Sequence, residues 1–159
     1  MICQISDFFV KPDSACYELG CSTGELSLNL AKHNASKPGA KFVGIDIEPD
    51  MVKVAQKKKS AAKLPNVEFL VDDVTQFDFG VSDFIVAYYC VQFIRPSQRQ
   101  LLIDKIYSSL NWGGAFLLFE KVRACDARFQ DIMTSLYNDY KITQGYKPEE
   151  IFHKAQSLK

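Results

Sequence analysis

The sequence has few of the residues that build metal centres or disulfide frameworks. Its 159 residues include two histidines and five cysteines, and no two cysteines form a C-x-x-C pair. An odd number of widely spaced cysteines argues against a disulfide framework or a zinc site. We therefore expect reduced, mostly buried thiols, no bound metal, and ordinary surface roles for His33 and His153.

Long apolar runs and an excess of charge of one sign are also lacking. A membrane span requires about 20 apolar residues, and no run approaches that length. The N-terminus does not read as a signal segment. Nineteen Lys plus Arg balance nineteen Asp plus Glu, so no net field attracts the chain to nucleic acid or to a membrane. We expect a soluble, cytoplasmic protein in which Lys57–Lys59 form a solvated helix face; contact of these lysines with RNA phosphates is the alternative.

The composition is that of a globular protein. With 47% hydrophobic and 24% charged residues, the chain is long enough to bury one core. We find no internal repeat and no low-complexity segment. The prediction is a single domain over residues 1–159.

Short apolar runs alternate with helical patterns along the chain. The predicted strands are Ala15–Leu19, Lys41–Asp46, Val67–Val71, Phe84–Tyr89 and Ala115–Glu120. The predicted helices cover about 2–10, 25–31, 49–62, 96–110, 127–140 and 149–157, and the Asn111–Gly114 turn follows the fourth of them. Alternation of this kind predicts an α/β fold, in which a parallel sheet has helices on both faces.

The most informative local pattern is Glu18-Leu19-Gly20-Cys21-Ser22-Thr23-Gly24, directly after the first strand. We call Gly20–Gly24 the glycine loop. Gly20 allows a tight turn and a close approach to a ligand, and Gly24 allows the next helix to pack near the sheet. Glycines at a tight turn with no ligand are the alternative interpretation.

Acidic residues follow the next two strands. Asp46 ends the second strand, where nucleotide-binding α/β folds place an acid that accepts the ribose hydroxyls. Asp73 and Val74 follow the third strand and suit an adenine amine and ring face, respectively. A turn-capping role for the aspartate is the alternative.

Four further residues each have two possible roles when only the sequence is considered. Glu18 suits either a ligand ammonium group or backbone donors of the loop. Tyr88 suits either ligand stacking or the core. Arg99, like Arg95, suits either an anionic substrate or a surface ion pair.

Taken together, the acid-x-G-x-x-x-G pattern, Asp46, Asp73 and Asn111–Gly114 resemble the class I S-adenosylmethionine-dependent methyltransferases. The likeness covers nearly the whole chain. More narrowly, Tyr17–Gly24 and Val91–Lys121 (VQFIRPSQRQLLIDKIYSSLNWGGAFLLFEK) resemble the carboxy-S-adenosylmethionine synthases of that fold.

The resemblance implies a Rossmann-like fold and conversion of S-adenosylmethionine and prephenate to carboxy-S-adenosylmethionine and phenylpyruvate. The product would serve modification of a tRNA wobble uridine. It further implies a small-molecule second substrate and a homodimer. From the balanced charge, we expect no direct nucleic-acid contact. The resemblance assigns Gly20, Cys21 and Ser22 to the methionine part of S-adenosylmethionine or carboxy-S-adenosylmethionine, Asp46 and Ile47 to the ribose and adenine, and Asp73 and Val74 to the adenine. To these candidate ligand-binding residues we add Glu18, Gly24 and Tyr88. The resemblance assigns no catalytic base.

The sequence also departs from that family. Tyr88 stands where the family has asparagine, and Trp112 stands where it has proline. The family's upstream tyrosine and its downstream, carboxylate-pairing arginine have no counterpart, and neither Arg123 nor Arg128 matches the latter. The two last strands of a seven-stranded sheet are also missing. We expect a part of a longer chain, or a partner subunit that covers the edge of the fifth strand.

Three functions follow as hypotheses. The first is synthesis of carboxy-S-adenosylmethionine, and the second is methylation of a small molecule. The third is nucleotide binding without turnover.

Overall fold

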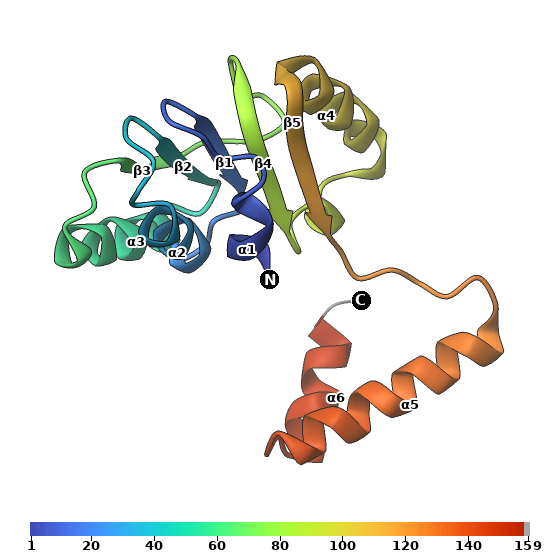
Figure 1. Ribbon diagram of the computed structural model, residues 1–159. Helices are drawn as coiled ribbons and strands as arrows, with labels where there is room; N and C mark the ends of the chain where they lie inside the picture. Colours follow the sequence, from blue (N-terminus) through green and yellow to red (C-terminus); the bar gives the residue numbers. More distant parts are fainter. Residues whose placement is uncertain (158–159) are drawn as a thin grey trace. The chain divides into compact units, whose positions relative to one another are not determined.

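The computed structural model describes residues 1–157, which fall into two compact units, the first over residues 1–121 and the second beginning at Val122. The first unit contains a five-stranded sheet. Its strands are β1 (Ala15–Leu19), β2 (Lys41–Asp46), β3 (Val67–Val71), β4 (Ser82–Tyr88) and β5 (Leu110–Phe119). Their spatial order is β3-β2-β1-β4-β5, and every pairing is parallel (Figure 1). The predicted parallel α/β sheet is confirmed.

Helices cover both faces of this sheet, as predicted. The helices of the first unit are α1 (Ile2–Ser6), α2 (Glu25–His33), α3 (Pro49–Ala62), the short 3₁₀ helix η1 (Val91–Phe93) and α4 (Pro96–Ser109). Figure 1 shows α4 on the side opposite α1, α2 and α3. No helix of the described residues is long and apolar enough to cross a membrane.

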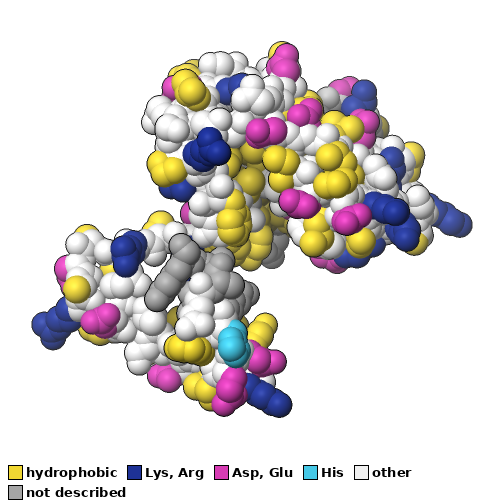
Figure 2. Space-filling view, turned by 180° about the vertical axis from the view of Figure 1, so that it is seen from behind, with side chains coloured by type: hydrophobic (Ala, Val, Ile, Leu, Met, Phe, Trp, Pro, Cys, Tyr) yellow, Lys and Arg dark blue, Asp and Glu magenta, His cyan; other side chains and the backbone are white. Residues whose placement is uncertain are grey.

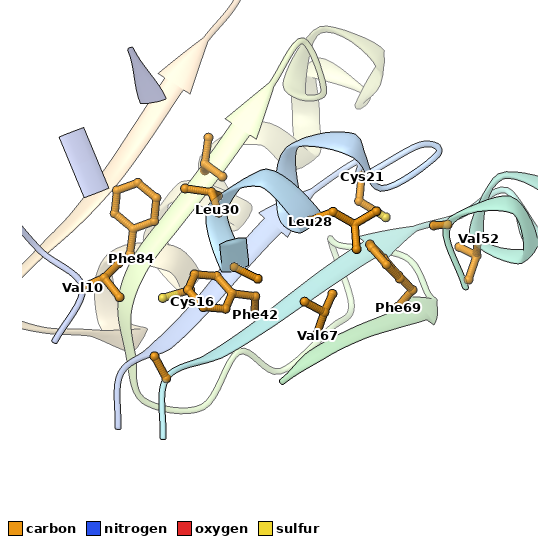
Figure 3. Close-up of a cluster of buried hydrophobic side chains, with 14 residues drawn as sticks. Val10, Cys16, Cys21, Leu28, Leu30, Phe42, Val52, Val67, Phe69 and Phe84 are labelled. Carbon is orange, nitrogen blue, oxygen red and sulfur yellow. The ribbon is translucent and has the colours of Figure 1, made fainter. Parts of the chain in front are cut away.

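Alternation along the strands divides the core into two clusters. Phe42 and Phe84 face one side, where they pack with Leu28 and Leu30 of α2 (Figure 3). Ile45 and Ile85 face the other side, and Leu102 and Ile106 of α4 pack there. Because successive strand residues point to opposite faces, strands that are apolar throughout require cover on both sides.

The fifth strand begins earlier than predicted. The sequence placed it at Ala115–Glu120 after a turn at Asn111–Gly114, whereas β5 begins at Leu110. Leu110 pairs with Ser82 and Ala115 pairs with Phe84, so the residues between them form an irregularity within the strand. Gly113 in this irregularity has a φ of +83°. The prediction was wrong because turn-forming residues here bend a strand without ending it.

Other boundaries differ by a few residues, and β4 begins at Ser82 instead of at the predicted Phe84. The first helix was predicted over residues 2–10, but α1 ends at Ser6. The chain turns there, and the amides of Phe9 and Val10 both donate to the Ser6 carbonyl. The fourth strand was predicted to include Tyr89, but Tyr89 leaves the strand with a φ of +57°.

The second unit contains α5 (Ala127–Thr143) and α6 (Pro148–Ser157), as predicted within a few residues. Asp126 caps α5, because its Oδ1 accepts from the Phe129 amide at 2.9 Å. α5 has no buried residue, so this unit does not bury a core around that helix. The single domain expected over residues 1–159 stays a prediction.

Candidate functional site at the carboxyl edge of the sheet

Parallel pairing brings the predicted site residues to one edge of the sheet. Leu19 of β1 is level with Ile45 of β2 and with Ala87 of β4, and Asp46 is level with Val71 of β3. The residues that follow each strand therefore lie at the same edge. In open α/β sheets, this carboxyl edge is where ligands bind.

The glycine loop is closed by its own backbone bonds. The amides of Gly20 and Cys21 both donate to the Ile45 carbonyl, at 2.8 and 2.9 Å, and the Gly24 amide donates to the Cys21 carbonyl at 2.8 Å. Gly20 and Gly24 have φ values of +68° and +77°. These left-handed positions explain why glycine occurs at both.

Close packing supplies a second reason for Gly24. A methyl group at this position would lie 2.4 Å from Cζ of Phe69 and 2.8 Å from Cβ of Ala55. The helix start thus packs against the sheet, as the sequence predicted. A methyl group at Gly20 would lie 2.8 Å from Sγ of Cys90.

Asp46 has both carboxylate oxygens placed by the backbone. Its Oδ2 accepts from the Ser22 amide at 2.7 Å, and its Oδ1 accepts from the Glu48 amide at 3.0 Å. The carboxylate is therefore fixed between the glycine loop and the start of α3. Each carboxylate oxygen has a further lone pair for a ligand hydroxyl. The neighbouring Ile47 is 63% exposed, which suits contact with a ligand at the open edge.

Glu18 is buried under the glycine loop. Its Oε2 accepts from both the amide and the hydroxyl of Ser27 in the first turn of α2, at 2.8 and 2.5 Å. Burial raises the pKa of Glu18 to about 7, although the Ser27 hydrogen bonds oppose the increase. Of the two partners left open for Glu18, the structure shows the local donors; a contact with ligand stays a prediction.

Asp73 caps the turn after β3, which was the alternative to ligand binding. Its Oδ1 accepts from the amide and hydroxyl of Thr75 at 2.9 and 2.8 Å. Val74 is 8% exposed and packs in the second core cluster. Contacts of this pair with adenine stay predictions.

Tyr88 ends β4 with its side chain 48% exposed, so it is not a core residue. Its ring packs edge-on against Tyr89, with centroids 4.7 Å apart, and lies 5.6 Å from Phe119. Trp112, the other departure from the family pattern, lies fully exposed near the start of β5. Because β5 is parallel to β4, Trp112 is at the edge opposite Tyr88.

The thiols near the glycine loop are not activated as nucleophiles. Cys21 is buried among core side chains (Figure 3), and burial raises its pKa well above the ordinary value. Burial also raises the pKa of Cys90 to about 12. Both thiols are protonated at neutral pH, whereas the thiolate is the reactive form. Among the described residues, no group of His, Cys, Asp or Glu is arranged to hold a metal ion.

One set of positioning side chains was missed by sequence reasoning. We call Tyr89–Arg95, which follows β4, the wall segment. Glu120 accepts from two of its amides, those of Val91 and Gln92, at 2.6 and 3.2 Å. Arg99 donates to the Ile94 and Gln92 carbonyls at 2.8 and 3.0 Å. The Arg99 guanidinium thus contacts backbone, which neither the anion nor the ion-pair interpretation predicted.

A family model described as a methyltransferase domain matches residues 17–114. That range runs from β1 into β5 and includes the glycine loop, Asp46 and Asp73. The chain belongs to the methyltransferase domain family. The Rossmann-like, class I methyltransferase fold predicted from the sequence is confirmed.

Solved structures agree on this fold. The YcgJ protein from Bacillus subtilis superposes with a TM-score of 0.66 at 18% identity, over 77% of this chain and 50% of its own. A coclaurine N-methyltransferase bound to N-methylheliamine and S-adenosylhomocysteine gives a TM-score of 0.62 at 19% identity, over 74% of this chain and 33% of its own.

Curated relatives cover more of the sequence. A carboxy-S-adenosyl-L-methionine synthase from Enterobacter sp. (strain 638) is 34% identical over 159 residues, which are 99% of this chain and 64% of that protein. The synthase of the same name from Klebsiella pneumoniae (strain 342) is 33% identical with the same coverage. The chain spans slightly less than two thirds of the length of these relatives.

Proposed function

We propose that this chain is the S-adenosylmethionine-binding part of a carboxy-S-adenosyl-L-methionine synthase. The observation that carries the nucleoside part is Asp46, whose two oxygens are fixed by the Ser22 and Glu48 amides at the carboxyl edge. A fixed acceptor pair suits the two hydroxyls of a ribose. Ile47, at the open edge, suits the adenine, and the glycine loop suits the methionine part.

The reaction is proposed from the synthase relatives and from the resemblance described above. S-adenosylmethionine and prephenate would give carboxy-S-adenosylmethionine, phenylpyruvate and water. The sulfonium methyl group loses a proton and gains the carbon dioxide that leaves prephenate, and the proton combines with the hydroxide expelled from the ring. The product would enter tRNA wobble uridine modification. The proposal also includes a homodimer, a cytoplasmic location and no direct contact between this chain and RNA.

Charge placement supports the absence of direct RNA contact. On the face shown in Figure 2, Lys and Arg are interspersed with Asp and Glu and do not gather in one patch. Lys58, in the middle of the lysine run, donates to Thr23 Oγ1 at 3.0 Å and pairs with Glu25 at 3.2 Å. A mixed surface lacks the basic stripe that phosphate binding uses.

Methylation of a small molecule is the second candidate, and Tyr88 favours it. An exposed tyrosine ring stands at the end of β4, where the synthase pattern has asparagine. An aromatic ring in place of an amide replaces hydrogen bonding by stacking. This exchange would suit a different second substrate.

The test is to purify the chain, denature it and identify any released nucleoside by mass spectrometry, then to titrate S-adenosylhomocysteine by calorimetry. A nucleoside heavier than S-adenosylmethionine by one carbon dioxide supports the synthase. Plain S-adenosylmethionine or S-adenosylhomocysteine favours the methyltransferase. No released nucleoside together with no titratable binding would contradict all three hypotheses, because each of them requires the nucleoside to bind.

Asp46→Asn is the matched site variant for the titration. It removes the negative charge that strengthens hydrogen bonds to the ribose, so binding should weaken by about 1 to 3 kcal/mol. Asp104→Asn, an exposed acid on α4, is the control and should bind as the wild type does. Equal affinity of a folded Asp46→Asn variant would remove Asp46 from the ligand site.

A further inference from the structure

The wall segment is held from two sides by charged side chains that lie outside it. Glu120, directly after β5, accepts from the Val91 amide through Oε1 and from the Gln92 amide through Oε2. Arg99, in α4, uses Nε for the Ile94 carbonyl and Nη2 for the Gln92 carbonyl. The two side chains thus make four hydrogen bonds, each to a different peptide group between Cys90 and Arg95.

Apolar packing anchors only part of the segment: Val91 lies in the second core cluster. The side chains of Tyr89 and Phe93 are 47% and 72% exposed, whereas Glu120 and Arg99 are partly buried. Two charged side chains are therefore partly desolvated to hold a segment whose large aromatic groups stay in solvent. Charge-assisted hydrogen bonds are among the strongest available for fixing a backbone.

The segment they hold is in direct contact with the glycine loop. Cys90 immediately precedes the two amides that Glu120 binds. A methyl group at Gly20 would lie 2.8 Å from Cys90 Sγ and 3.0 Å from its Cβ. Tyr89, the residue before Cys90, has a left-handed φ of +57°, and its amide donates to the Phe119 carbonyl at 2.8 Å. Any shift of the wall segment would therefore change the distance between Cys90 and Gly20.

We propose that Glu120 and Arg99 are positioning residues for the ligand site: they hold the wall segment against the glycine loop and so fix the spacing of the two walls between which the nucleoside binds. They act through Cys90 and Tyr89 and need no contact with the ligand themselves. This inference rests on the proposed nucleoside-binding function.

The experiment compares Glu120→Gln, Arg99→Lys and the wild-type chain. The amide of Gln presents an NH₂ group to one of the two peptide N–H donors, and Lys lacks the planar fork that reaches two carbonyls. Three quantities are measured: the Kd for S-adenosylhomocysteine by calorimetry, hydrogen exchange of the amides of residues 90–95, and Tm. Glu68→Gln, at an exposed acid on β3, is the control.

We expect about a 5- to 20-fold increase in Kd for each variant, corresponding to the loss of one or two net hydrogen bonds, with faster exchange confined to the wall segment. Glu68→Gln should leave both unchanged. If Glu120→Gln fails to fold, Arg99→Lys decides by the same criteria.

Two outcomes would overturn the inference in different ways. If the wild type binds the ligand and the folded variants exchange faster with no change in Kd, the two residues have a purely structural role. If the wild type binds no S-adenosylhomocysteine, the proposed function itself is wrong and the positioning role is lost with it.

Discussion

The glycine loop and the wall segment meet at one edge of the sheet, yet different forces hold them. The glycine loop is fixed by backbone hydrogen bonds, by two left-handed glycines and by contacts that leave no room for a Cβ. The wall segment contains no glycine and is fixed by Glu120 and Arg99 from neighbouring elements. The comparison teaches that the first region depends mainly on small residues in its own sequence, with the Asp46 carboxylate bound to the Ser22 amide. The second depends on charged residues from neighbouring elements and on the core packing of Val91.

The largest expected effect is at Gly24. Gly24→Ala adds a Cβ at a left-handed φ and within 2.4 Å of Phe69 Cζ. We expect a loss of about 2 to 5 kcal/mol of unfolding free energy, from backbone strain and overpacking together. Urea denaturation measures it.

Gly80→Ala separates these two causes. Gly80 also has a positive φ, +57°, but a methyl group there would meet nothing within 4 Å. Gly80→Ala should therefore lower the unfolding free energy through backbone strain alone, by about 1 kcal/mol. Equal losses for the two variants would show that close packing does not hold the glycine loop.

Glu18 gives the next effect, as a dependence on pH. Its pKa in the folded protein is raised to about 7 from 4.5, so the folded state binds a proton more tightly than the unfolded chain does. The stability that this contributes is present below pH 4.5 and is lost as the pH rises to about 7.

Between pH 5 and pH 8, the wild type should therefore lose about 1 to 3 kcal/mol more unfolding free energy than Glu18→Gln, which does not titrate. Urea denaturation of both proteins at the two pH values checks it. Parallel losses in both would mean that Glu18 does not carry the raised pKa.

A double-mutant cycle at Gly20 and Cys90 examines the point where the two regions touch. Gly20→Ala should destabilise the wild type more than it destabilises a Cys90→Ala background. The added methyl group would lie 2.8 Å from Cys90 Sγ, and that sulfur is absent from the Cys90→Ala background. The expected coupling is about 0.5 to 1.5 kcal/mol. Additive effects would mean that the two segments are not in contact in solution.

The smallest effect is expected at Lys58, a charged residue that contacts the glycine loop through Thr23. Its ammonium group lies 3.0 Å from Thr23 Oγ1, but the side chains of Lys58 and of its partner Glu25 are 41% and 70% exposed. Lys58→Met should change the unfolding free energy by less than about 0.5 kcal/mol. A loss above about 1 kcal/mol would show that the glycine loop also depends on its contact with the Lys58 ammonium group.

The sequence by itself determined the features that depend on neighbouring residues. The short apolar runs predicted the first and last residues of β1, β2 and β3 correctly. Pro49 and Pro96 marked the starts of α3 and α4. Gly20, Gly24 and Asp46 were found because a left-handed turn and an acid at a strand end have local signatures.

Tertiary structure alone decided the features that depend on pairing between distant residues. The start of β5 at Leu110 follows from its pairing with Ser82. Folding also brings together the hydrogen-bonding partners of three ionisable side chains. Glu18 thereby binds Ser27, and Glu120 and Arg99 bind the wall segment. The sequence identifies a carboxylate or guanidinium side chain, but it does not show whether that group binds a ligand, a neighbouring ion or a peptide group. Only the folded arrangement, in which buried polar groups must find partners, selects among them.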